Sequence, residues 1–126
     1  MSSGRSIEPM GDTPSLVRAF AEAAALNGRA TDAANYRDGN RKHDIAMKAY
    51  RELRRRGVAA QDELRALLSD ENPWVRYWAA VVVLEYACDE AASVLERLAE
   101  TQESPALRFN AELVLSEWRK GNLSLE

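Results

Sequence analysis

The chain has 126 residues, 46% of them apolar and 29% charged, a composition typical of one globular domain that buries its own core. Its longest apolar run, Trp78–Leu84, is far shorter than the roughly 20 residues that cross a bilayer, so we expect no membrane segment. The single cysteine, Cys88, excludes an internal disulfide and a cysteine-rich metal site, and we expect a cytoplasmic protein.

Polarity and charge vary along the chain. Residues 1–12 are small and polar without helical periodicity, so we expect a flexible N-terminal arm before a single helical domain over residues 13–126. The net charge is −3, but Thr31–Gly57 contains 8 basic and 4 acidic residues, whereas Val58–Glu126 contains 6 basic and 13 acidic residues. The charge of the chain is therefore polarised between two successive segments.

Apolar residues recur at helical spacing through most of the chain, and no alternating run competes as a strand, so the sequence predicts an all-α fold without a sheet. The expected helices, about six in number, span residues 14–26, 32–56, 60–69, 73–88, 90–101 and 105–119. The helix that starts at Pro73 is apolar on nearly all sides. This pattern predicts that it packs on more than one side, at the centre of the domain.

Capping residues and glycines set the expected helix ends. Asn27-Gly28 is a common left-handed stop, so we expect the first helix to end there. The second helix is expected to begin at Thr31-Asp32. Gly39 lies inside this second helix, where glycine is less favourable than alanine by about 1 kcal/mol. The sequence leaves open whether the second helix breaks or bends there.

The second half of the chain repeats itself at an offset of 32 residues, with Pro73 matching Pro105 at the start of each copy. The same offset aligns Val75 with Leu107, Arg76 with Arg108, Ala79 with Ala111 and Val83 with Leu115. The unit is a helix pair, and stacked pairs bury a continuous core that one pair alone could not bury. Within this unit we expect Arg76 to reach Asp70 or the carbonyls of the preceding turn.

The stretch Asp70–Leu84 resembles the second half of a HEAT repeat, because a Val-Arg pair is followed by small residues and a leucine. The whole chain, including Asn35–Lys42 and Ala49–Gly57, is similar to a small bacterial family of HEAT-like helical proteins of unknown function. The resemblance implies a right-handed, armadillo-type stack of helical hairpins. It implies no catalytic residues.

Few residues suggest catalysis. His43, the only histidine, lies near Asp38 and Asp44 in the sequence and could serve as a general base. It also shares a helical stripe with Tyr50, and this position favours a packed side chain. Cys88 is expected to be a small buried hydrophobe. Because the sequence contains no phosphate-binding glycine loop, nucleophile motif or set of metal ligands, we expect no catalytic residue, cofactor or metal.

We therefore predict a non-enzymatic protein-interaction module. Its binding surface is expected near Trp74 and Tyr77, because aromatic side chains are preferred anchors of protein interfaces. Trp74 falls in the first turn of its helix, off the main apolar stripe, and the sequence leaves open whether it is exposed. Arg37 and Arg41, on the basic helix, complete the expected surface.

Alternative functions stay open at this point. The acidic segment Val58–Glu126 would suit an immunity protein that neutralises a basic bacterial toxin, whereas an enzyme centred on His43 is the least supported reading. Nucleic-acid binding is disfavoured, because the run Arg54–Arg56 ends its helix and the pI is near 5.3. We expect a protein partner, no nucleic acid and no membrane, and association with a second copy stays open.

Overall fold

The computed structural model describes residues 11–123, which form six α-helices and one 3₁₀ helix and contain no strand. The elements are α1 (Thr13–Asp32), α2 (Tyr36–Arg55), α3 (Val58–Asp62), the 3₁₀ helix η2 (Glu63–Ser69), α4 (Pro73–Val83), α5 (Cys88–Leu98) and α6 (Pro105–Arg119). The all-α prediction is thus confirmed for the described part of the chain. The right-handed sense of the stack stays a prediction.

Most of the predicted N-terminal arm, residues 1–10, lies outside the described residues. Its last two residues, Gly11 and Asp12, are held by the helical domain. Asp12 accepts a hydrogen bond from the Ser15 amide at 2.9 Å and so caps α1. The Gly11 carbonyl accepts a hydrogen bond from Arg56 Nη2 at 2.6 Å. The contacts of the domain therefore extend two residues beyond its predicted boundary.

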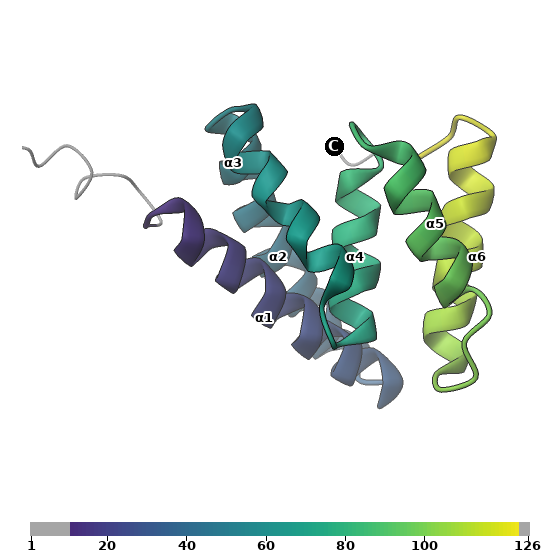
Figure 1. The fold of residues 1–126 in the computed structure, drawn as a ribbon. Helices are drawn as coiled ribbons and strands as arrows, with labels where there is room; N and C mark the ends of the chain where they lie inside the picture. Colours follow the sequence, from purple (N-terminus) through teal and green to yellow (C-terminus); the bar gives the residue numbers. More distant parts are fainter. Residues whose placement is uncertain (1–10, 124–126) are drawn as a thin grey trace, which may run out of the picture.

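The helices pair into three hairpins, which are α1 with α2, η2 with α4, and α5 with α6, and the short α3 leads from α2 into η2 (Figure 1). The helix α4 lies in the middle, because η2 and α5 both pack against it and α1 crosses it. Of the 11 residues of α4, eight are buried, which confirms the prediction of a central apolar helix. No helix in the described part of the chain is long and apolar enough to cross a membrane.

One continuous core runs through the three hairpins. Its largest fully buried side chains, which come from every helix except α3, are Leu16, Phe20, Tyr50, Leu53, Leu64, Val82, Val83, Leu95 and Leu107. Burying one such side chain contributes about 1.5–3 kcal/mol. Because each hairpin supplies part of this core, the stacking of hairpins holds the fold together.

The first helix is longer than the sequence predicts. It continues through Asn27 and Gly28 to Asp32, so the predicted stop is wrong. Gly28 is instead a packing position, since a Cβ atom at this residue would lie 2.0 Å from Trp74 Cγ. The missing side chain lets the indole of α4 lie directly against the backbone of α1.

The turn between α1 and α2 comes later than expected, at residues 33–35. Ala34 adopts a positive φ of 59°, and the Asn35 amide then donates to a carbonyl of α1 at 2.8 Å. Asn35 caps α2 by accepting a hydrogen bond from the Asp38 amide at 3.3 Å. The Thr31 hydroxyl donates to a carbonyl one turn back in α1, so the predicted start of the second helix is also wrong.

Gly39 does not break α2. It is buried in the first turn of this helix, where an added Cβ atom would lie 3.6 Å from Thr31 Oγ1, an ordinary contact distance. Its carbonyl accepts a hydrogen bond from Asn27 Nδ2 at 2.8 Å, which joins α2 to α1. The first two helices therefore pack closely at Gly39, and α2 stays continuous.

In the second half of the chain, one predicted helix is split and another ends early. The short helix expected over residues 60–69 is split into α3 and η2, and α4 ends at Val83 instead of continuing to Cys88. The chain turns at residues 84–87, where the Ala87 amide donates to the Val83 carbonyl at 2.9 Å. Because of this turn, Cys88 opens α5 at the surface, and the expectation that it is buried is wrong.

Candidate functional site

Two of the four predicted contact residues, Trp74 and Tyr77, lie inside the molecule. Trp74 is 5% exposed and its Nε1 donates to Asp32 at 3.0 Å, while Tyr77 is 4% exposed. Burial raises the pKa of the Tyr77 hydroxyl above its ordinary value. Trp74 is buried because α1 covers the first turn of α4, so it is not a surface anchor.

The other two predicted contact residues, Arg37 and Arg41, are exposed on α2. Arg41 forms an ion pair with Asp38 at 2.9 Å, one helical turn away. Since Trp74 and Tyr77 are enclosed by the core, the structure does not bring the four predicted residues together in one surface. The basic face of α2 is exposed, but it lacks the aromatic anchors that the prediction assigned to it.

His43 packs against an aromatic ring, as predicted from the helical stripe that it shares with Tyr50. Its ring centroid lies 5.0 Å from that of Trp78, and its Nδ1 lies 3.6 Å from Asp44 Oδ1. The Trp78 indole donates to Asn27 Oδ1 at 2.8 Å, which holds this ring in the contact between α1 and α4. Within residues 11–123, no three His, Cys, Asp or Glu side chains are grouped as a metal site would need.

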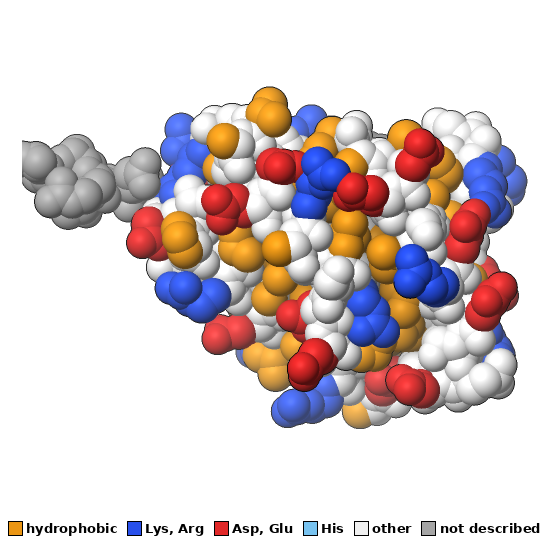
Figure 2. All heavy atoms as spheres, in the orientation of Figure 1, with side chains coloured by type: hydrophobic (Ala, Val, Ile, Leu, Met, Phe, Trp, Pro, Cys, Tyr) orange, Lys and Arg blue, Asp and Glu red, His pale blue; other side chains and the backbone are white. Residues whose placement is uncertain are grey.

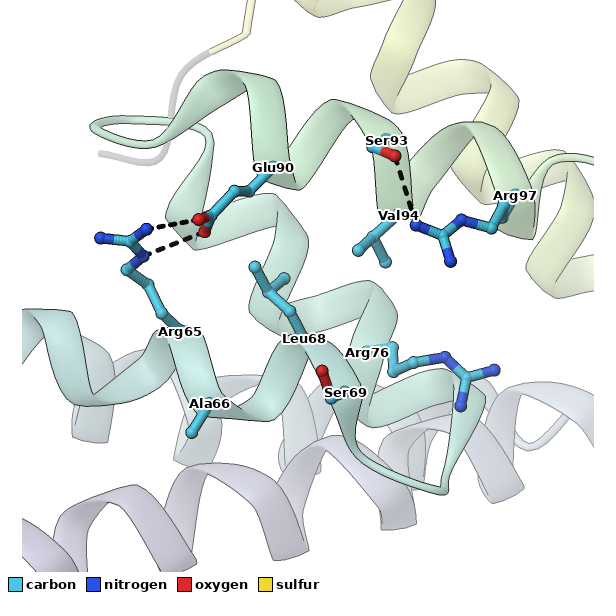
Figure 3. Close-up of a pocket in the computed structure, with 9 residues that line it drawn as sticks. All are labelled: Arg65, Ala66, Leu68, Ser69, Arg76, Glu90, Ser93, Val94 and Arg97. Atoms are coloured by element: carbon cyan, nitrogen blue, oxygen red, sulfur yellow. Dashed lines mark hydrogen bonds and ion pairs between the residues drawn. The ribbon is translucent and has the colours of Figure 1, made fainter.

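A groove opens between η2 and α5, beside the start of α4, and has a volume of about 750 Å³ (Figure 3). Its lining residues are Arg65, Ala66, Leu68, Ser69, Arg76, Glu90, Ser93, Val94 and Arg97. A second hollow of about 280 Å³ shares four of these residues and extends the groove to Thr101 and Glu103. We call the two hollows together the arginine groove.

The arginine groove has an apolar middle and charged ends. Leu68 from η2 and Val94 from α5 point toward each other in the middle (Figure 3). At one end, Arg65 Nε donates to Glu90 Oε1 at 3.0 Å and Nη2 donates to the second carboxylate oxygen. This pairing joins η2 to α5 and raises the pKa of the Arg65 guanidinium. The charge at this end is therefore neutralised within the protein.

Arg76 and Arg97 form the other end of the arginine groove (Figure 3). Arg76 Nη1 donates to the Asp70 carbonyl at 2.7 Å and to the Glu71 carbonyl at 3.2 Å, which confirms the predicted contact with the turn. Arg97 Nη2 donates to Ser93 Oγ at 3.3 Å. These acceptors are neutral, and among the described residues neither guanidinium forms an ion pair with a carboxylate. Two positive charges thus lie beside the apolar middle of the groove, formed by Leu68 and Val94, which we call the apolar floor.

Sequence reasoning missed the arginine groove. Figure 2 shows basic side chains beside apolar surface where α5 faces η2 and α4. Arg65 and Arg97 look in the sequence like ordinary solvent-facing residues of amphipathic segments, and only Arg76 draws attention through the repeat. The available signal was the repeat itself, because stacked hairpins place equivalent helices of neighbouring units side by side.

The comparison with known proteins agrees with this architecture. The family model for HEAT repeats matches residues 37–116, which is more than half of the chain and runs from the first turn of α2 into α6. Every residue that lines the arginine groove falls within this range. Neither a curated protein nor a solved structure matches the chain.

Proposed function

The chain belongs to the HEAT-repeat proteins, and we propose that it is a protein-interaction module that docks a partner in the arginine groove. The observation that carries this proposal is the groove itself, in which two arginines without a carboxylate partner lie beside an apolar floor. Arginine is enriched among the residues that contribute most to protein interfaces, and the burial of apolar surface favours most protein association. A groove that combines them offers a partner both affinity and orientation.

The lining residues support binding, and not catalysis, as the role of the groove. Glu90 is already held by Arg65, and Ser93 accepts a hydrogen bond from Arg97. A guanidinium has only N–H donors and no acceptor, so Arg76 and Arg97 are suited to bind anions. Chemistry of this kind recognises a ligand without transforming it.

Site-directed photocrosslinking tests this proposal. We expect benzoylphenylalanine at Ser93, an exposed position in the groove, to capture a protein partner in extracts of the native host, identified by mass spectrometry. The same label at Lys48, which is exposed on α2 outside the groove, is the matched control and should not capture that partner. Equal capture at both positions, or capture at neither, would contradict docking in the groove.

A further inference from the structure

We propose that the arginine groove binds an extended, acidic segment of the partner, in which an apolar side chain stands next to carboxylates. This inference rests on the proposed function and adds the chemistry of the bound segment. The apolar side chain contacts Leu68 and Val94 in the middle of the groove (Figure 3). The carboxylates bind Arg76 and Arg97, whose hydrogen-bond acceptors within the protein are neutral.

The guanidinium donors determine the sign of the charge that the ligand carries. Arginine carries five N–H donors in a planar fork that matches the two oxygens of a carboxylate. Arg76 uses Nη1 for two backbone carbonyls, and Arg97 uses Nη2 for a serine hydroxyl. The remaining donors of both groups can form charge-assisted hydrogen bonds, which are about twice as strong as neutral ones. A carboxylate is therefore a better ligand here than an amide or a hydroxyl.

The apolar floor adds the second requirement on the ligand. Leu68 is 9% exposed and Val94 is partly buried, so an apolar side chain that covers them removes their remaining surface from water. The floor lies between the neutral Arg65–Glu90 pair and the two arginines at the other end (Figure 3). This order places the apolar side chain in the middle and the strongest carboxylate contact on one side of it.

Neighbouring charges limit the ligand to a short segment. Glu103 lines the far part of the groove and repels further carboxylates. The surrounding segment Val58–Glu126, with 13 acidic and 6 basic residues, disfavours a long polyanion such as nucleic acid. At physiological salt the screening length is about 8 Å, so a short acidic segment responds mainly to the arginines of the groove.

Fluorescence anisotropy with labelled peptides and the full chain tests this inference. We expect the acidic peptide EDLDE to bind at least about tenfold more tightly than its amide counterpart QNLNQ, because charge-assisted hydrogen bonds are lost in the latter. Arg97→Ala should weaken binding of EDLDE about tenfold for the same reason. Arg37→Ala, which removes an exposed arginine from α2, is the matched control and should leave binding unchanged. Circular dichroism verifies that both variants keep their helices.

Several results would overturn the inference. Equal binding of the two peptides, or equal losses in Arg97→Ala and Arg37→Ala, would show that the groove does not select carboxylates. Tighter binding of a five-nucleotide single strand would assign the arginines to phosphate instead. Capture of a partner at Ser93 without binding of EDLDE would refute the acidic segment and leave the proposed function standing. Binding of EDLDE without any capture would support the chemistry of the groove and count against a protein partner.

Discussion

Gly28 is a residue at which helix packing depends on a missing side chain. Its backbone lies against Trp74, and an alanine would place its Cβ atom 2.0 Å from Trp74 Cγ. We expect Gly28→Ala to lower the free energy of unfolding by about 1–3 kcal/mol, the usual cost of overpacking a core. Urea denaturation followed by circular dichroism measures this change.

A second helical glycine provides the control for this prediction. Gly39 is also buried in a helix, but a Cβ atom there would have its nearest neighbour at 3.6 Å. Gly39→Ala should therefore raise the free energy of unfolding by about 0.5–1 kcal/mol, because alanine is the better helix former. If both substitutions had the same effect, the close approach of α1 and α4 at Gly28 would be refuted.

At the scale of helices, the end of α1 joins all three hairpins through Asp32. Its carboxylate accepts hydrogen bonds from Trp74 Nε1 at 3.0 Å and from the Ser104 hydroxyl at 2.7 Å. Ser104 Oγ in turn accepts a hydrogen bond from the Leu107 amide at 3.0 Å and so caps α6. One side chain of α1 therefore holds the first turn of α4 and the start of α6 in place.

Removing this carboxylate should loosen the stack. We expect Asp32→Ala to lower the free energy of unfolding by about 1–3 kcal/mol, because two partly buried donors lose their acceptor. Asp44→Ala, at an exposed position on α2, should change it by less than about 0.5 kcal/mol. Urea midpoints of the two variants give the comparison, and indistinguishable midpoints would contradict the joining role of Asp32.

Glu52, near the end of α2, makes the fold sensitive to acid. Its carboxylate accepts hydrogen bonds from Arg55 and Arg56, which lower its pKa to about 2. An unfolded glutamate has a pKa of about 4.3. The hydrogen bonds to Glu52 therefore stabilise the folded state fully above the unfolded-state pKa of about 4.3. This stabilisation is lost as the pH falls toward the pKa of Glu52 in the folded state.

Replacing the carboxylate should remove this part of the acid response. We expect Glu52→Gln to be less stable than the unaltered protein near neutral pH, and to lose less stability between about pH 5 and pH 2. Urea midpoints at several pH values measure both effects. A variant with the same acid dependence as the unaltered protein would refute the assignment to Glu52.

Across the whole molecule, the features that the sequence predicts correctly depend on short spacings. Helical periodicity indicates the helices, and the repeat from Pro73 to Pro105 indicates that the second half consists of equivalent hairpins. The contact of Arg76 with the carbonyls of the preceding turn follows from its place a few residues after that turn. The helices and the Arg76 contact are each determined within one helix pair, and the repeat is visible from a comparison of two successive pairs.

The features that the sequence does not predict depend on packing between hairpins. Asn27-Gly28 by itself is typical of a helix stop, and only its contact with Trp74 explains why the helix continues. The exposure of Cys88 depends on where the chain turns after α4. The arginine groove combines side chains from η2, α4 and α5, so no single segment of the sequence carries its pattern.

The most direct test of docking in the arginine groove is amide hydrogen exchange of the full chain, alone and bound to the partner captured at Ser93. We expect exchange to slow mainly in η2 and α5, whose side chains line the groove, with little change in α2. Slower exchange centred on α2, with η2 and α5 unchanged, would contradict this account and assign the interface to the basic helix.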